Sequence, residues 1–310
     1  MSEIELGPVG LVLDVADDRA HLEQAAEAER LGFSALWVAG GQLESLEPLV
    51  ELLRATEKVA VASSIIPLDV HGVTDVVRLV DLLDDGEVER LVAGFGASQR
   101  ATRPLAGMRE FLDELDAADV SLPAGRRLIA ALGPRKLELA RDRAAGAIMM
   151  LVTPGHTAWA REILGPGATL VVHQLVVLDT EVEQARQTLR GTLRFLLGVE
   201  GYAANMPRMG FGDDEIADLS DGLVDAVATT GDADAIIAAV RAHLAAGADH
   251  VALSVLSDGT QPGPIEVARG GSRGVQCAAV IGSAGCAQER SAGRFRRGGR
   301  RPGPVFRGGR

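Results

Sequence analysis

Short apolar runs alternate with longer amphipathic stretches from residue 10 to residue 255 of this chain. The runs are apolar at successive positions rather than at every second one, which predicts strands buried on both faces, as in a parallel sheet. The stretches between them repeat apolar residues at helical spacing, most clearly over residues 73–83. The predicted strands are residues 10–14, 35–38, 59–65, 91–95, 127–131, 147–151, 170–177 and 251–255.

Eight strand-and-helix repeats of this kind predict a (β/α)8 barrel, the TIM-barrel fold. Gly32 and Gly247 each follow a predicted helix, where a left-handed residue commonly ends one. A doubly wound open sheet is the alternative. No Gly-x-Gly-x-x-Gly follows the first strand, and Gly94-Phe95-Gly96 at the end of the fourth strand lacks the third glycine. The pattern therefore favours the barrel.

Residues 269–310 differ in composition from the rest of the chain. They hold ten arginines and one acid, and eleven of the last 41 residues are glycine, without any helical or strand period. The closing helix expected after the eighth strand is therefore missing or replaced. We interpret residues 1–268 as the barrel domain and residues 269–310 as a disordered or non-native tail, such as a frameshift in a GC-rich gene would produce. A basic arm that binds RNA is the alternative.

Charge, hydropathy and the absence of certain motifs argue against several classes of function. Residues 1–268 carry 21 basic and 42 acidic side chains, which argues against binding of nucleic acid, because phosphates are neutralised by Lys and Arg. No apolar run is long enough for a membrane span, and the first residues lack a signal-peptide pattern, so a cytoplasmic protein is expected. Both cysteines, Cys277 and Cys286, lie in the tail. Residues 1–268 contain no His-x-x-x-His or carboxylate cluster at metal-ligand spacing, which argues against a metal site. They contain no Gly-x-Ser-x-Gly elbow, which argues against acyl transfer by a serine.

Six segments point more narrowly to a family by their order and spacing. They are EAERLGFSALWV (27–38), RLVAGFGAS (90–98), RPLAGMREFL (103–112), AALGPRK (130–136), LVTPGHT (151–157) and AGADHV (246–251). Over residues 6–256 the chain resembles the luciferase-like monooxygenase superfamily, and within it the actinobacterial oxidoreductases that depend on coenzyme F420. The resemblance implies a TIM barrel that binds a flavin or deazaflavin at the carboxyl ends of its strands, and a homodimer.

The implied activity is hydride transfer between coenzyme F420 and an unidentified small organic substrate. The alternatives are an FMN-dependent monooxygenase, since both cofactors share a ring site and a phosphate, and a non-catalytic barrel that binds a cofactor. In either enzyme the cofactor carries the chemistry, and the protein supplies orientation, electrostatics and exclusion of water.

The resemblance also implies where the cofactor lies. The family often has a non-proline cis peptide at the end of the third strand, forming a bulge behind the ring system, and by position it falls at Ser64-Ile65. The segments after strands five and six each open a helix, whose free N–H groups favour a phosphate; a turn at Gly133 and a helix cap at Thr153 are the structural alternatives. The predicted cofactor-binding residues are Ser64, Ile65, Asp69, Gly94, Gly96, Leu132, Gly133, Val152, Thr153 and Thr157.

His71, in the loop after the third strand, is the predicted catalytic residue, because a histidine there could donate to the cofactor or move a proton. It could equally cap the helix that follows. Many family members carry an acid and a histidine after the second strand, where this chain has Ala39-Gly40-Gly41. The proton donor is therefore left open by the sequence.

The sequence leaves the roles of several other residues open. His173 and Gln174 interrupt the apolar seventh strand and could point into the barrel. Arg135 and Lys136 could meet an anionic cofactor chain or belong to the solvated surface. The apolar residues of segment 201–221, Tyr202 among them, could line a substrate pocket, form a subunit contact or pack over the end of the barrel.

Overall fold

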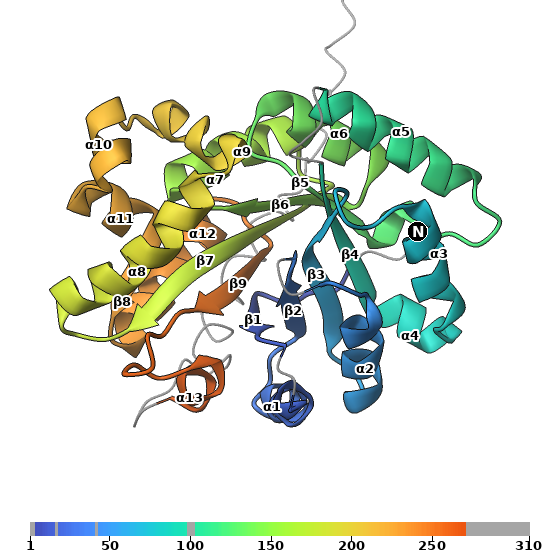
Figure 1. The fold of residues 1–310 in the computed structure, drawn as a ribbon, viewed down its shortest axis with the longest axis horizontal. Helices are drawn as coiled ribbons and strands as arrows, with labels where there is room; N and C mark the ends of the chain where they lie inside the picture. The colour runs from blue at the N-terminus through green and yellow to red at the C-terminus, as the bar shows by residue number, and fades with distance from the viewer. Residues whose placement is uncertain (1–3, 16–17, 41–42, 98–102, 271–310) are drawn as a thin grey trace, which may run out of the picture.

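A closed barrel of eight parallel strands forms the centre of the computed structural model, which describes residues 4–15, 18–40, 43–97 and 103–270 (Figure 1). The pairing order is β6-β5-β4-β3-β2-β1-β9-β7, and β6 pairs with β7 to close the ring. This confirms the predicted (β/α)8 barrel. The barrel strands are β1 (Val9–Leu13), β2 (Ala35–Ala39), β3 (Ala60–Pro67), β4 (Leu91–Gly96), β5 (Arg127–Ala130), β6 (Gly146–Met150), β7 (Thr169–Leu178) and β9 (His250–Val255).

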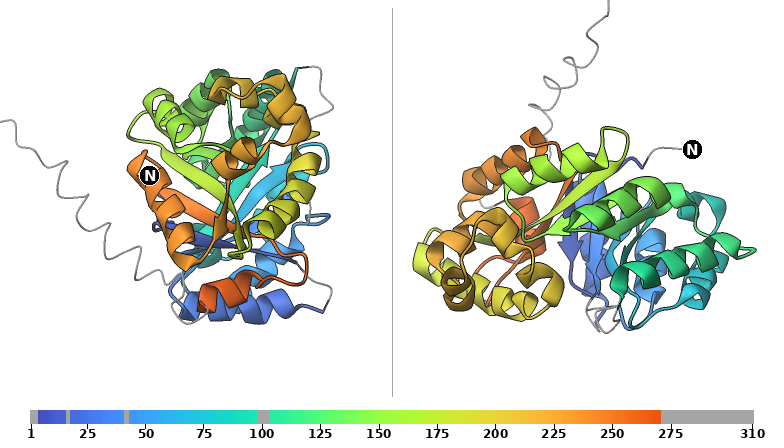
Figure 2. Two further views of the ribbon diagram at one scale, coloured as in Figure 1. Left: turned by 90° about the vertical axis from the view of Figure 1, so that its left-hand side faces the viewer. Right: turned by 90° about the horizontal axis from the view of Figure 1, so that it is seen from above.

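Helices surround the strands (Figures 1 and 2). Proline stands in the first turn of α5, α6 and α7, where its missing N–H breaks no helical hydrogen bond. The helices of the barrel wall are α1 (Ala20–Arg30), α2 (Glu47–Ala55), α3 (Val73–Asp81), α4 (Asp85–Arg90), α5 (Pro104–Ala117), α6 (Pro134–Arg143), α7 (Pro154–Leu164), α8 (Val182–Leu197) and α12 (Ala233–Ala245).

The segment between α8 and α12 forms a layer outside the barrel that the repeat pattern does not contain. β8 (Ala228–Gly231) pairs with the outer half of β7, from Leu175 to Leu178. Short helices precede it: α9 (Glu200–Ala203), the 3-10 helix η3 (Met206–Met209), α10 (Asp213–Asp218) and α11 (Asp221–Val227). Another 3-10 helix, η2 (Ala124–Arg126), leads into β5. Met206 and Leu223 in this layer are fully buried, so the layer has an apolar core of its own.

The closing helix of the barrel is replaced by a short one, α13 (Pro264–Arg269), which lies beside α1 (Figure 1). Its Ile265, Val267 and Ala268 are buried against the barrel. Arg269 forms two hydrogen bonds with the carboxylate of Glu27 on α1, at 2.6 and 2.7 Å. Strands β1 and β9 are therefore covered here by six residues. The tail beyond Gly270, with both cysteines, lies outside the described residues, as do Gly41 and Ser98.

The barrel interior holds a buried column of aromatic and imidazole rings. The Trp37 indole N–H donates to His250 Nε2 at 3.0 Å. Because indole has no acceptor, His250 Nε2 must be unprotonated, so its proton sits on Nδ1 and is donated to the Gly7 carbonyl at 2.7 Å. His173 packs edge-on against Trp37, with ring centroids 4.9 Å apart. Trp37 belongs to a cluster of buried apolar side chains, and burial lowers the pKa of His250 to about 4, so this imidazole is neutral.

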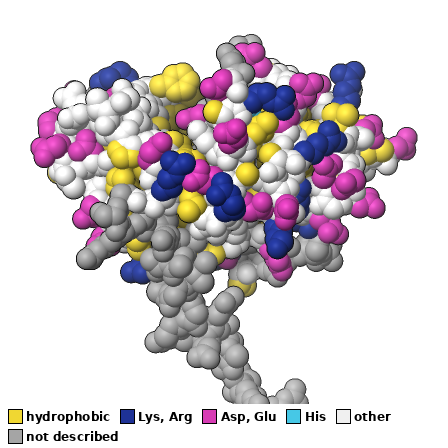
Figure 3. Space-filling model, turned by 90° about the horizontal axis from the view of Figure 1, so that it is seen from below, with side chains coloured by type: hydrophobic (Ala, Val, Ile, Leu, Met, Phe, Trp, Pro, Cys, Tyr) yellow, Lys and Arg dark blue, Asp and Glu magenta, His cyan; other side chains and the backbone are white. Residues whose placement is uncertain are grey.

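Acidic and basic side chains are interspersed over the described part of the face seen in Figure 3. Among the described residues, no helix combines the length and the apolar character that a bilayer-spanning segment requires. Within the same residues, no group of three or more metal-ligating side chains is found.

Candidate ligand site at the carboxyl end of the barrel

A pocket opens at the carboxyl ends of β3 to β7, the end at which (β/α)8 enzymes hold their active sites. We call it the inner pocket; its volume is about 120 Å³. Its described lining is uncharged and mostly apolar. Representative lining residues are Ser64 and Ile65 on β3, Met150 on β6, His173 on β7, and Val199 and Tyr202 from the layer after α8.

One wall of the inner pocket is a bulge at the end of β3. The peptide bond between Ser64 and Ile65 is cis, as predicted from the resemblance, and the ladder between β3 and β4 shifts register at this point. The Ile65 side chain lies against Gly96 so closely that a Cβ on Gly96 would overlap its end. Ile65 thereby takes the space that a side chain on the neighbouring strand would need.

The same bulge explains the glycine that follows β2. A Cβ on Gly40 would overlap the carbonyl oxygen of Ile65, which is backbone and cannot move aside as a side-chain end can. The structure therefore leaves no room for a side chain at Gly40, which lies in the segment 39–41 where many members of the resembled family carry an acid and a histidine. The lack of an acid or histidine at Gly40 is thus built into this chain's packing.

Two polar groups of the inner pocket have no hydrogen-bond partner among the described residues. They are the Ser64 hydroxyl and both ring nitrogens of His173. Burial, with a smaller contribution from His250, lowers the pKa of His173 to about 3, so its imidazole is neutral at pH 7. A neutral imidazole has one donor and one acceptor, and leaving such a buried group unpaired costs about 1–3 kcal/mol. The pocket therefore offers hydrogen-bonding capacity that a ligand can satisfy.

A second hollow continues outward from the inner pocket, since the two share Ala97, Leu132, Val199 and Gly201 as lining residues. We call it the outer cleft; its volume is about 650 Å³, within the range of small-molecule sites. The inner pocket thus accepts one end of a ligand, and the outer cleft has room for the rest.

The outer cleft is cationic. Arg135 and Lys136 line it from the first turn of α6, and Arg208 lines it from η3. The Arg208 guanidinium stands over the amino end of α6: a Cβ on Gly133 would lie 3.7 Å from its nitrogens. Burial lowers the pKa of Lys136 from its usual value of 10.5. A helix amino end and three cations together favour an anionic ligand group, against one lining acid, Glu200.

The structure brings several of the predicted cofactor-binding residues to these hollows. Ser64, Ile65 and Gly96 line the inner pocket, Leu132 lines both hollows, and Gly133 lines the outer cleft. Gly94 stands beneath the pocket, where its N–H donates to Ser63 Oγ at 3.0 Å and does not reach the lining.

His71 lies away from the inner pocket. Its Nε2 is 2.8 Å from the Leu43 carbonyl oxygen and its Nδ1 is 3.8 Å from an Asp75 carboxylate oxygen. The side chain is buried beside a separate hollow between α3 and α5. Asp69 is exposed in the turn after β3 and lines neither hollow. His71 therefore links the loop after β3 to the segment that precedes α2, through its contact with the Leu43 carbonyl.

The residues predicted at the amino end of α7 also lie outside both hollows. Thr153 caps the helix, its hydroxyl accepting from the His156 N–H at 3.2 Å. The Thr157 hydroxyl is fully buried, 2.9 Å from His243 Nδ1, and Val152 is buried in the core. His156 supports the site indirectly, since its Nε2 is 3.2 Å from the Leu132 carbonyl oxygen. The amino end of α6, not that of α7, is the one that faces the cleft.

Four residues that line the two hollows are not among the predicted cofactor-binding residues: His173, Met150, Tyr202 and Arg208. The sequence does mark His173, because an imidazole is unusual within a continuous apolar strand. Tyr202 belongs to segment 201–221, for which lining a substrate pocket is one of the alternatives. Nothing in the sequence pattern singled out Arg208, because it reaches the cleft from η3, far along the chain from α6.

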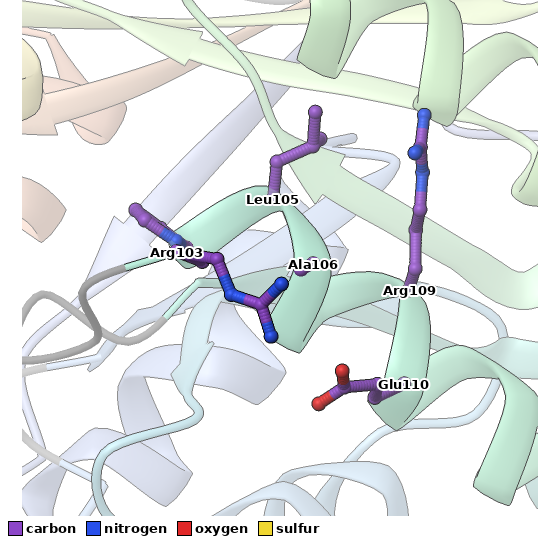
Figure 4. Close-up of a pocket in the computed structure, with 6 residues that line it drawn as sticks. Arg103, Leu105, Ala106, Arg109 and Glu110 are labelled. Carbon is purple, nitrogen blue, oxygen red and sulfur yellow. The ribbon is translucent and has the colours of Figure 1, made fainter.

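A further hollow lies on the outer surface at the start of α5 (Figure 4). The Arg103 guanidinium and the Glu110 carboxylate extend toward one another in this view, whereas the Arg109 side chain points away from both. The three charged ends therefore do not meet at one point, and we assign no ligand to this hollow.

No family model and no curated protein matches this chain. Solved structures do resemble it. The coenzyme F420-dependent tetrahydromethanopterin reductase from Methanopyrus kandleri superposes with a TM-score of 0.59 at 16% identity, over 82% of this chain and 94% of that one. The oxygenating constituent of 3,6-diketocamphane monooxygenase from Pseudomonas putida, in complex with FMN, gives 0.60 at 13% identity, over 88% and 96%.

An F420-dependent secondary alcohol dehydrogenase, in complex with an F420-acetone adduct, gives a TM-score of 0.56 at 14% identity, over 81% of this chain and 94% of that one. The chain therefore has the (β/α)8 fold of these F420-dependent and FMN-binding enzymes, as the sequence resemblance predicts.

Proposed function

We propose that this chain is an oxidoreductase of the luciferase-like family, which uses coenzyme F420 to transfer a hydride to or from a small organic substrate. One observation carries the proposal: an uncharged pocket with unpaired polar groups opens directly into a cationic cleft. A ligand with a flat heterocyclic head and an anionic chain matches both parts. The fold shared with F420-dependent enzymes supports the same assignment.

The residues present fit this cofactor. Ile65 and Met150 would pack against the ring and exclude water, while Arg135, Lys136 and Arg208 would bind the anionic chain. The bound deazaflavin would supply the carbon that carries the hydride. The Tyr202 hydroxyl, whose pKa burial raises above its usual value of 10, is protonated at neutral pH and donates to Met150 Sδ at 3.9 Å beside the pocket. We therefore expect orientation and water exclusion, not a carboxylate, to be the chain's main contribution.

FMN is the second candidate cofactor, favoured by the FMN complex among the similar structures. It carries a single phosphate, whereas F420 adds further anionic groups along its chain. Three cations spread over the outer cleft, from α6 and from η3, match the longer anion better. An FMN-dependent monooxygenase and a non-catalytic barrel that binds a cofactor are the alternatives to the proposed activity.

The test is a parallel fluorescence titration with F420 and with FMN. We expect F420 to bind at least tenfold more tightly. Lys136→Gln and Arg208→Gln should each weaken F420 binding about fivefold, equivalent to roughly 1 kcal/mol. Arg78→Gln, which removes an exposed charge on α3, is the control and should leave affinity unchanged. Tighter FMN binding would assign the chain to the FMN alternative, and binding of neither would contradict the proposal.

A further inference from the structure

His173 is the buried group of the site that the proposed function has not yet used. It lies at the middle of β7, paired in register with Met150 on β6 and Ala252 on β9, and its side chain is 2% exposed. It lines the inner pocket, and neither ring nitrogen has a partner among the described residues.

The partner of His173 has to come from the pocket side. Trp37, which His173 touches on the barrel side, uses its single donor on His250. Both nitrogens of His250 are engaged in turn, with Trp37 and with the Gly7 carbonyl. The neighbouring Gln174 amide bonds Thr229 and the Leu175 carbonyl. Since the Trp37 contact also limits how the imidazole can turn, its hydrogen-bonding edge is left for the pocket.

Ser64 provides the matching group across the pocket. β3 and β7 are four strands apart in either direction around the ring, so they stand on opposite sides of the barrel. A flat head lying between them meets the Ser64 hydroxyl on one side and the His173 imidazole on the other. The described lining holds no charged side chain, so a charged group at this depth would lose its hydration without compensation.

We propose that His173 is a specificity-determining residue that binds an uncharged imide edge of a heterocyclic head, a carbonyl beside an N–H, in the inner pocket. The unprotonated nitrogen of a neutral imidazole is an acceptor, which complements the N–H of such an edge. This inference rests on the proposed function, because it takes the head to be the ring of the cofactor. It adds that recognition of the ring depends on its imide N–H.

Two neutral ring probes without an anionic chain test the proposal: lumiflavin, which has the imide N–H, and 3-methyllumiflavin, in which a methyl group replaces that hydrogen. We expect the wild-type protein to bind lumiflavin about tenfold more tightly than its methyl derivative. His173→Phe keeps the ring contact with Trp37 but removes the donor and acceptor, so it should bind both probes equally. His173→Gln restores a donor and an acceptor and should recover part of the preference.

His243→Phe replaces a buried histidine that lines neither hollow and is the control, expected to keep the wild-type preference. Thermal melting of each variant reports whether it is folded, and the two-probe comparison in wild type stands even if a variant is not. Equal binding of both probes by wild type, with F420 still bound, would overturn the role of His173 and leave the proposed function intact. Binding of neither probe nor F420 would overturn both.

Discussion

At the residue scale, the site depends on side chains that are absent as much as on those present. A Cβ at Gly40 would overlap the Ile65 carbonyl oxygen, and a Cβ at Gly96 would overlap the Ile65 side chain. The bulge therefore determines which residues can stand beside it. The glycine after β2, which the sequence left as an unexplained departure from the resembled family, follows from this contact.

Gly40→Ala tests that contact directly. The added methyl group would meet the Ile65 backbone oxygen, so we expect a loss of about 1–3 kcal/mol in the free energy of unfolding, as for other overpacked positions. Gly191→Ala, inside α8 with no atom within 4 Å of the new methyl group, should instead stabilise by about 0.5–1 kcal/mol. Urea denaturation of both variants measures the difference. An unchanged stability for Gly40→Ala would contradict the close packing.

Several of the predicted cofactor-binding residues at strand ends line the two hollows. Leu132 and Gly133 were predicted because strand ends of a barrel meet at one face, whereas Ser64 and Ile65 were predicted from the family resemblance; all four line the two hollows. His71 was predicted because a histidine in the loop after the third strand could reach the cofactor, but its imidazole is directed toward the Leu43 carbonyl. A strand order predicts where a loop begins, and not which way a side chain beyond the strand will point.

At the element scale, the helices that follow β5 and β6 differ in whether their amino ends face the outer cleft, although their first turns are similar. Each starts with proline in its first turn. The amino end of α6 faces the outer cleft beneath Arg208, whereas that of α7 is closed by its own Thr153 cap. Sequence alone could not separate them, because the difference comes from Arg208 in the layer after α8, whose packing is not periodic.

Thr153→Ala distinguishes a helix cap from a ligand contact. Loss of the hydroxyl that accepts from the His156 N–H should lower the free energy of unfolding by about 1 kcal/mol. The affinity for F420 should stay within about twofold of wild type, because Thr153 lines neither hollow. Denaturation and a fluorescence titration on the same samples measure both effects. A tenfold loss of F420 affinity with unchanged stability would instead make Thr153 a phosphate ligand.

At the scale of the whole molecule, the parallel barrel could be predicted because buried strands and amphipathic helices alternate eight times. β8 and α13 were harder to predict from the sequence, because four and six residues are too few to show a hydrophobic period. Pro264 and Gly270 do mark the beginning and end of α13. Their burial comes from tertiary packing against β7, β1 and α1. Short elements of this kind follow from the fold around them.

The interior of the molecule also sets how its stability should respond to pH. Burial lowers the pKa of His173 to about 3 and those of His243 and His250 to about 4, from 6.5 in the unfolded chain. Between pH 6.5 and 4 the unfolded chain therefore binds protons that the folded chain does not. Their contribution to stability is complete above pH 6.5 and falls as the pH decreases, with about three protons taken up on unfolding at pH 5. Urea denaturation at several pH values between 5 and 7.5 measures the number of protons taken up on unfolding. This pH range lies above the usual titration of Asp and Glu near pH 4. His173→Phe should reduce the uptake by about one proton, and a stability that does not change between pH 7 and 5 would show that these histidines are not buried in the neutral form.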